Sequence, residues 1–461
     1  MQKLADIKKV YFLGIGGIGM SALARYFAAQ GISVSGYDRM STELTLHLEK
    51  EGIAVHYQDD SALLPSDLNI ADSLIVYTPA IPANHKELNL LIDRGFTLHK
   101  RAEVLGIICN SQRTIAVAGT HGKTSVSTMI AHIMKSSAIG CSAFLGGISK
   151  NYHTNLLIDN TGSPWVVAEA DEFDRSFLQL TPELAVITSM DADHLDIYGS
   201  HEKVIESFQL FARQIKHGGS LVLKKGLSAG NDLSHIKLFY YSITESADFS
   251  AENIKLNNGF YQFDLKTPDF RIEKLVLNYP GLLNVENAVA ASAMAVLAGV
   301  SVEDIRHGLA TYSGVKRRFD IQLNNGTYVL IDDYAHHPEE LRATIQSVRD
   351  VYKDRTITGV FQPHLYSRTK DFATGFANSL DLLDEIVLLD IYPARELPMD
   401  GVTSELIFNQ MQNPNKKLCN KKELFSLAVS FKPGIVLLMG AGDIDTLVQP
   451  VKEQLLKNKN G

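Results

Sequence analysis

The chain has few cysteines, no long apolar run and no strong excess of either charge. Only three of its 461 residues are cysteine, at positions 109, 141 and 419. They are odd in number, far apart and without metal-ligand spacing, which favours a reducing, cytoplasmic compartment over a disulfide-linked framework. No run approaches the ~18 apolar residues that cross a membrane. No apolar signal-peptide core follows the charged start "MQKLADIKKV". We therefore expect no membrane insertion.

The bulk composition limits the partners and the domain count. The formal net charge of −8 at pH 7 gives no electrostatic reason to expect nucleic acid, although local basic pockets can still bind phosphates. The composition, 45% hydrophobic and 21% charged, is that of a globular protein. A chain of 461 residues exceeds one ordinary domain, so we expect roughly two to four.

A glycine-rich turn follows the first apolar strand. In "VYFLGIGGIGM", Gly14, Gly16 and Gly19 lie between a predicted strand and a helix, and Asp38 follows 19 residues after the last glycine. This is the dinucleotide-binding pattern, in which glycines admit a pyrophosphate to a helix N-terminus. Further strands and helices alternate up to about residue 108, which predicts a parallel sheet. The pattern does not demand nicotinamide, because other diphosphates present the same group; an NAD(P)-dependent oxidoreductase is one alternative.

A second glycine loop, "GTHGKTS", begins at Gly119. A buried strand enters it and a helix leaves it, so backbone N–H groups can surround a polyphosphate. Lys123 can reach the β- and γ-phosphates, and the Thr124 hydroxyl can bind Mg²⁺. The usual P-loop has four residues between its glycines, whereas only two separate Gly119 from Gly122. The alternative is a glycine turn that only caps a helix.

Acidic side chains follow two further strands of this region. Glu169, Asp171, Glu172 and Asp174 follow the strand in "PWVVAEAD", and strand ends are where open α/β sheets bind ligands. Carboxylates suit Mg²⁺, although a solvated acidic loop is the alternative. In "SMDADHLDIYG", His194 lies among aspartates, which by itself is more often a surface ion pair than a metal site.

The last third of the chain repeats this placement. The strand before "DDYAHHP" is followed by Asp332, Asp333, His336 and His337. After the next strand, "FQPHLYSRT" contains His364 and Arg368, and arginine suits bidentate binding of carboxylate or phosphate. At the boundary before this region, "GVKRRF" supplies a basic cluster, which contacts a phosphate across a cleft or is a solvated linker. Its members are Lys316, Arg317 and Arg318.

Taken in order, these motifs resemble those of the Mur ligases. The similar stretches cover nearly the whole chain: "GIGGIGMSALAR", "YTPAIPANHKEL", "AGTHGKTS", "AEADEFDRSF", "DADHLDIY", "GVKRRFD", "DDYAHHP", "FQPHLYSRT" and "IYPARELP". The family's own loop is G-T-x-G-K-T, which accounts for the departure from the usual P-loop. The ordered set is far more specific than either glycine motif alone.

The resemblance implies an α/β protein of three domains. Residues 1–110 would form a Rossmann-like domain that binds a UDP-sugar, and residues 111–315 a P-loop-like domain that binds ATP and Mg²⁺. Residues 316–461 would form a second Rossmann-like domain that closes over the site and positions the amino acid. Short β-like runs within residues 219–280 predict a small antiparallel patch beside the central sheet.

The motifs are most similar to those of the family member that joins L-alanine to UDP-N-acetylmuramate, giving ADP and phosphate through an acyl phosphate, in peptidoglycan precursor synthesis. The resemblance implies ATP and two Mg²⁺ ions as cofactors, no nucleic acid, and a monomer or homodimer. A sibling ligase that adds a preformed peptide remains an alternative, as does a non-catalytic, ATP-switched binding protein.

The resemblance also carries roles to individual residues. The predicted catalytic residues are Lys123, Arg318, His336, His364 and Arg368. The predicted ATP-binding residues are Gly119, Thr120, His121, Gly122, Lys123, Thr124, Ser125, Asn284, Asn287 and Asp333. The predicted UDP-binding residues are Gly14, Gly16, Gly17, Ile18, Gly19, Met20, Asp38, Thr78, Ala80 and Asn84. The predicted Mg²⁺ ligands are Thr124, Glu169 and His194. The family often has histidine where this chain has Leu283, and leucine cannot form that residue's polar contacts.

Overall fold

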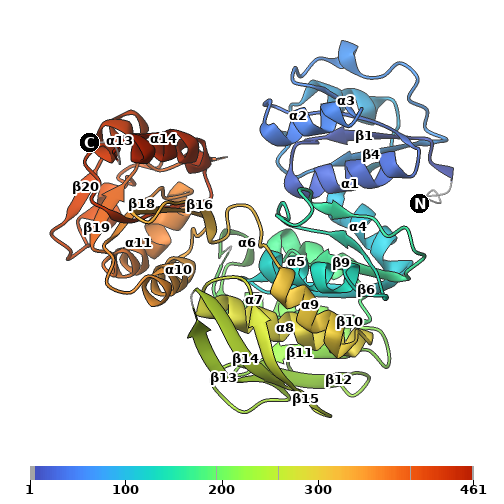
Figure 1. Cartoon of the computed structure of the whole chain (residues 1–461). Coiled ribbons are helices and arrows are strands. Elements are labelled where there is room, and N and C mark those ends of the chain that lie inside the picture. The colour runs from blue at the N-terminus through green and yellow to red at the C-terminus, as the bar shows by residue number, and fades with distance from the viewer. Residues whose placement is uncertain (1–5, 194, 258, 395, 459–461) are drawn as a thin grey trace. The chain divides into compact units, whose positions relative to one another are not determined.

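The computed structural model describes residues 6–193, 195–257, 259–394 and 396–458. The chain divides into two compact units (Figure 1). The first comprises residues 1–252, 264–275 and 287–312, and the second comprises residues 253–263, 276–286 and 313–461. Among the described residues, none of the helices combines the length and apolar character needed to span a bilayer.

The first unit begins with a parallel five-stranded sheet in the order β3-β2-β1-β4-β5. Its strands are β1 (Lys9–Leu13), β2 (Ser33–Tyr37), β3 (Ala54–His56), β4 (Ser73–Tyr77) and β5 (Leu98–Lys100). Its helices are α1 (Ile18–Ala29), α2 (Glu43–Lys50), α3 (Lys86–Asp93) and α4 (Arg101–Asn110). The predicted alternation of strands and helices is confirmed, and the glycine turn lies after the central strand β1.

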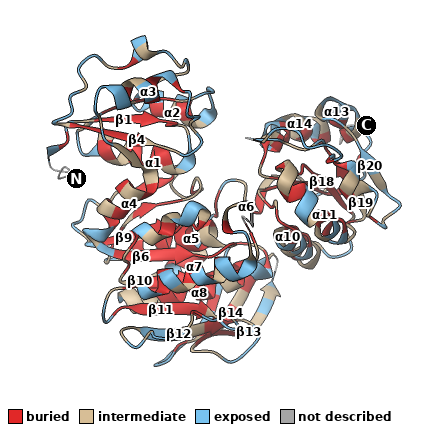
Figure 2. Ribbon diagram, turned by 180° about the vertical axis from the view of Figure 1, so that it is seen from behind, coloured by how far each residue is buried: buried red, intermediate tan, exposed pale blue. Residues whose placement is uncertain are grey.

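A ten-stranded sheet follows in the order β15-β14-β13-β12-β11-β10-β6-β9-β7-β8, and its strands up to residue 252 lie in the first unit. Its nucleotide-loop half consists of β6 (Arg113–Ala118), β7 (Ser142–Phe144), β8 (Leu156–Leu157), β9 (Trp165–Glu169) and β10 (Leu184–Ile187). Its helices are α5 (Lys123–Lys135), α6 (Leu195–Tyr198), α7 (His201–Arg213), α8 (Leu282–Ala298) and α9 (Val302–Thr311), and residues 282–286 of α8 belong to the second unit. The central strands of this sheet are buried (Figure 2).

The region expected to form an antiparallel patch is partly parallel. Strands β11 (Ser220–Lys224) and β12 (Lys237–Ser242) pair in parallel and extend the central sheet. Residues 225–236 supply about the dozen residues that a parallel connection needs. The patch proper consists of the consecutive strands β13 (Phe249–Asn257), β14 (Phe260–Lys266) and β15 (Arg271–Leu277), whose short connections require antiparallel neighbours.

The second unit contains a six-stranded sheet in the order β16-β17-β21-β18-β19-β20. Its strands are β16 (Asp320–Asn324), β17 (Tyr328–Asp333), β18 (Ile357–Phe361), β19 (Glu385–Leu388), β20 (Lys416–Leu418) and β21 (Gly434–Met439). Its helices are α10 (Pro338–Val351), α11 (Tyr366–Leu380), α12 (Glu405–Phe408), α13 (Lys421–Ala428) and α14 (Val448–Asn458). The turn "NNG" at residues 324–326, a sequence typical of hairpins, joins β16 to β17, which pair antiparallel.

Candidate active site

The first glycine loop is packed against the ends of two neighbouring strands. Gly14 has a φ of +89°, and a Cβ there would lie 2.5 Å from Thr78 Cγ2. A Cβ at Gly16 would lie 2.8 Å from Asp38 Oδ2, and the Gly16 N–H donates to this oxygen at 2.7 Å. The loop is therefore held by Asp38 beyond β2 and by Thr78 beyond β4, at the carboxyl edge of the sheet.

Helix α1 leaves this loop with an uncapped start. Gly17 is its N-cap and makes no side-chain capping bond, which leaves first-turn N–H groups for an anion. Ile18 is exposed, whereas the Met20 side chain is buried in the core, so Met20 can reach a ligand only through its backbone. Ala80 and Asn84 lie farther along the loop after β4 and are exposed.

The second glycine loop is anchored by the end of β10. Gly119 has a φ of +141°, and a Cβ there would overlap the Thr188 hydroxyl. The Ser189 Oγ accepts from the His121 N–H at 2.7 Å and from the Thr120 hydroxyl at 2.9 Å. Sequence reasoning missed Thr188 and Ser189. Their position directly after the buried strand β10 is the available signal, because open α/β sheets bind ligands at the carboxyl ends of their strands.

Gly122 begins α5 in the left-handed region, at a φ of +82°. A Cβ there would lie 3.2 Å from Asn287 Oδ1, so this amide lies beside the loop. Lys123 and Thr124 form the first turn of α5, with Thr124 buried, and the Ser125 carbonyl accepts from the Tyr312 hydroxyl at 3.4 Å. Asn284 belongs to the second unit, where its amide donates to the Pro280 carbonyl at 2.6 Å.

Lys123 forms a buried ion pair with Glu172. Its Nζ lies 2.7 Å from Glu172 Oε2 and donates to the Gly119 carbonyl at 2.7 Å. The surrounding carboxylates, Glu172 first, outweigh burial and raise the pKa of Lys123, so the ammonium stays charged. Glu172 is 1% exposed, and burial raises its pKa to about 7 against the opposing effect of Lys123. The loop therefore holds a fixed cation where a polyphosphate would develop charge.

The acidic loop after β9 faces a small cavity. A Cβ at Gly146 would overlap the Glu169 carboxylate, so this side chain lies against the glycine. Glu169 and Asp171 line a cavity of about 160 Å³ together with Arg101 and Gly19. Carboxylate oxygens and the Thr124 hydroxyl are the hard ligands that Mg²⁺ prefers.

The third predicted Mg²⁺ ligand, His194, lies outside the described residues. Within the described ranges, no three His, Cys, Asp or Glu side chains gather in the arrangement of a metal site.

In the second unit, four predicted site residues gather near the carboxyl ends of β17 and β18: Arg318, Asp333, His336 and His364. Asp333 is buried and accepts from the Phe319 N–H at 2.6 Å and the Ala335 N–H at 2.9 Å. Burial raises the pKa of Asp333, and Arg318 opposes that rise. His336 lies with its ring centroid 6.1 Å from that of His364.

Glu340 links two of these residues. It lies 3.6 Å from Arg318 Nη1 and 3.1 Å from His336 Nδ1. Arg368, in the first turn of α11, is buried. Arg317, which precedes Arg318 in the sequence, is tied to the loop after β21, since its Nη2 donates to the Gly440 carbonyl at 2.7 Å.

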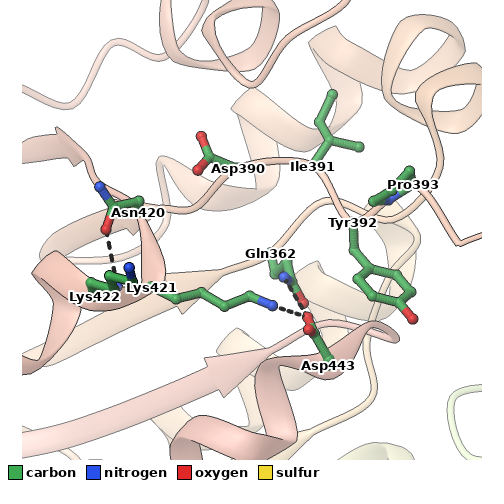
Figure 3. A pocket seen from close by; sticks show the side chains of 9 residues that line it. All are labelled: Gln362, Asp390, Ile391, Tyr392, Pro393, Asn420, Lys421, Lys422 and Asp443. Atoms are coloured by element: carbon green, nitrogen blue, oxygen red, sulfur yellow. Dashed lines mark hydrogen bonds and ion pairs between the residues drawn. The ribbon is translucent and has the colours of Figure 1, made fainter. Parts of the chain in front are cut away.

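A pocket of about 610 Å³ opens at the carboxyl ends of β18, β19 and β21 (Figure 3). Its lining residues are Gln362, Asp390, Ile391, Tyr392, Pro393, Asn420, Lys421, Lys422 and Asp443. Lys421 pairs with Asp443, which also accepts from Gln362 Nε2 at 3.0 Å. The Tyr392 ring stacks on His364 with centroids 5.8 Å apart, so the pocket adjoins the histidine pair.

Comparisons with known proteins agree along the whole chain. Three family models match: "Mur ligase family, catalytic domain" over residues 9–113, "Mur ligase middle domain" over 117–295, and "Mur ligase, glutamate ligase domain" over 317–442. The UDP-N-acetylmuramate–L-alanine ligase of Parabacteroides distasonis is 53% identical and covers 98% of this chain and 99% of its own length.

Solved structures share the fold. The UDP-N-acetylmuramate–alanine ligase of Thermotoga maritima is 26% identical, with a TM-score of 0.81, over 98% of this chain and 99% of its own. A murein peptide ligase of Psychrobacter arcticus is 23% identical, with a TM-score of 0.69 and 98% coverage of both chains, which supports the fold alone. The resemblance seen in the sequence motifs is confirmed: the chain belongs to the Mur ligase family.

Proposed function

We propose that this chain is an ATP-dependent ligase that joins L-alanine to the muramate carboxylate of UDP-N-acetylmuramate. The observation that carries the proposal is the 53% identity, over 98% of the chain, to a relative bearing that name. The buried Lys123 at a phosphate-type loop supports it, because a lysine at this position of such a loop reaches the β- and γ-phosphates of a nucleoside triphosphate. Residues 1–110, 111–315 and 316–461 would be the sugar-nucleotide, ATP and amino-acid domains.

The chemistry requires an activated carboxylate. A carboxylate is a poor acyl donor because its leaving group would be oxide, and phosphorylation by ATP supplies phosphate as a better one. The alanine amine then attacks the acyl phosphate through a tetrahedral intermediate and displaces phosphate. The first step brings several negative charges together, so positioning and cationic stabilisation supply most of the rate.

We assign the central loop to ATP. The backbone N–H groups of residues 119–125 would surround the phosphates, and Lys123 would stabilise the γ-phosphoryl group in transit. Thr124, Glu169 and His194 would hold two Mg²⁺ ions. When bound, the ions would neutralise phosphate charge. The amide of Asn287, which lies beside Gly122, is available to the nucleotide.

We assign the first glycine loop to the diphosphate of the UDP-sugar. A diphosphate there meets the uncapped start of α1. Asp38 accepts from the Gly16 N–H through Oδ2 and from the Met40 N–H through Oδ1, so we expect it to shape the loop near the uridine end. The exposed Ala80 and Asn84 would contact the same substrate.

We assign the cluster beyond β17 and β18 to the reacting groups. Arg318, His364 and Arg368 are cationic or hydrogen-bonding side chains suited to the muramate carboxylate and the incoming alanine. Asp333 would serve the nucleotide side, and His336 is oriented by Glu340.

The test is phosphate release by the purified full chain. Release should require ATP, Mg²⁺, UDP-N-acetylmuramate and L-alanine together. Release indifferent to alanine would refute the proposal. Competition between L-alanine and a preformed peptide separates this ligase from its sibling, and a nicotinamide absorbance change without ATP would favour the oxidoreductase.

A further inference from the structure

Arg101 is placed against the first glycine loop by the start of α4. A Cβ at Gly19 would lie 2.9 Å from both Cδ and Nη1 of Arg101. Gly19 has no left-handed φ, so its conformation does not require glycine. The missing side chain at position 19 instead makes room for the guanidinium at the first turn of α1.

The same guanidinium reaches the acidic loop of the central sheet. Its Nη2 donates to Asp171 Oδ2 at 3.1 Å, while Asp171 Oδ1 accepts from the Phe173 N–H at 3.1 Å. The Arg101 side chain is 22% exposed and that of Asp171 is 38% exposed, so solvent and ligands can reach the pair. Such a half-exposed pair is worth only about 0–1 kcal/mol and is readily exchanged for another anion.

Arg101 is the cation of the cavity between these two loops. The ten residues that line this cavity of about 160 Å³ include two carboxylates, Glu169 and Asp171, and one cation, Arg101. An oxyanion that enters from the glycine loop is repelled by the carboxylates and can be bound by the guanidinium alone of these three. Bidentate recognition of phosphate or carboxylate is the chemistry to which arginine is suited.

We propose that Arg101 binds an oxyanion of the sugar nucleotide, either its diphosphate or its muramate carboxylate, and exchanges Asp171 for it. This inference rests on the proposed function. Asp171 occupies the guanidinium in this structure, and both side chains line the cavity. Binding of the sugar nucleotide then releases Asp171. Occupancy of the glycine loop would in this way change the contacts of the acidic loop.

The test is calorimetric binding of UDP-N-acetylmuramate and of UDP to the full chain without ATP. Arg101→Gln should raise the Kd for UDP-N-acetylmuramate at least tenfold, which is about 1.4 kcal/mol. Arg101→Lys, which keeps the charge, should have a smaller effect. Equal loss for UDP identifies the diphosphate as the partner, and loss confined to the muramate compound identifies the carboxylate.

Two matched variants separate ligand binding from a structural tie. Lys100 forms a neighbouring ion pair with Asp174 at 2.8 Å but does not line the cavity, so Lys100→Gln should change Kd less than twofold. Asp171→Asn removes the competing anion and should leave binding unchanged or tighter. If Asp171→Asn weakened binding as much as Arg101→Gln, the ion pair would have a purely structural role and the inference would be wrong.

The outcomes also separate this inference from the proposed function. A wild-type chain that does not bind UDP-N-acetylmuramate would contradict the function itself. Wild-type binding with an unchanged Kd in both Arg101 variants would overturn only the role of Arg101. Arg101→Lys keeps the question answerable if Arg101→Gln does not fold.

Discussion

The buried pair between Lys123 and Glu172 predicts a pH-dependent cost for replacing the lysine. Lys123→Met removes the cation 2.7 Å from a carboxylate that is 1% exposed. Glu172 can escape an unpaired buried charge only by staying protonated. From its ordinary pKa of 4.5, protonation at pH 7 costs about 3 kcal/mol, but the wild type already bears most of this cost because its Glu172 has a pKa of about 7, so the loss from this source is small at that pH.

The sign follows from the direction of the shift. In the wild type, burial raises the pKa of Glu172 to about 7, so its unfavourable contribution grows between pH 4.5 and 7 and then stops. Without Lys123 the pKa rises further, and the folded state continues to lose stability above pH 7. The difference between wild type and Lys123→Met should therefore widen by about 1.4 kcal/mol per pH unit from pH 7 upward.

The single tryptophan makes this measurable. Trp165 lies in β9, is buried and has the Arg113 guanidinium 4.0 Å from its ring, so its fluorescence reports unfolding of the central sheet. Urea titrations at pH 6, 7, 8 and 9 give the stability difference at each pH. Lys123→Met/Glu172→Gln is the control, since a neutral amide removes the titration and should flatten the profile. Parallel profiles for the single and double variants would refute the reasoning.

Two further predictions concern other buried sites. Glu87 is fully buried, accepts from the Tyr11 hydroxyl at 2.6 Å and has its pKa raised by burial to about 7. The free energy of unfolding of Glu87→Gln should therefore rise by about 3 kcal/mol relative to that of the wild type between pH 4.5 and 8. Urea unfolding followed by circular dichroism measures this, and a pH-independent difference would contradict it. Gly119→Ala should abolish phosphate release, because it places a side chain at a φ of +141° and overlaps the Thr188 hydroxyl. The control Gly162→Ala, at a φ of +86° in open space, should retain release. Equal activities of the two variants would show that the overlap is tolerated.

Local patterns predicted the elements that rest on neighbouring residues. The strand, glycine turn and helix at residues 9–31 depend on apolar periodicity and on glycine's freedom, both readable from one segment. The hairpin turn at "NNG" likewise depends on a few adjacent residues. The direction of β11 and β12 was not, because a polar connection of moderate length permits either pairing and only the neighbouring strand decides.

The site divides in the same way. Lys123 and Thr124 are predicted from the sequence alone, because phosphate binding requires those residue types directly after the loop. Thr188, Ser189 and Arg101 were missed, because each acts on a loop distant in sequence, and the position of Thr188 and Ser189 after a strand does not show which loop they contact. In "GVKRRF", spacing could not show that Arg317 is tied to the Gly440 carbonyl while Arg318 is paired with Glu340.

By itself the sequence determined the class of chemistry: two phosphate-type loops, a lysine and post-strand acids, each set by the demands of a few adjacent residues. Tertiary structure alone decided which charges meet. Glu172 folds back onto Lys123, and Arg101 lies between Gly19 and Asp171. Coulombic interaction and desolvation depend on distance and burial in space, and both are created only when strands far apart in the chain share one sheet edge.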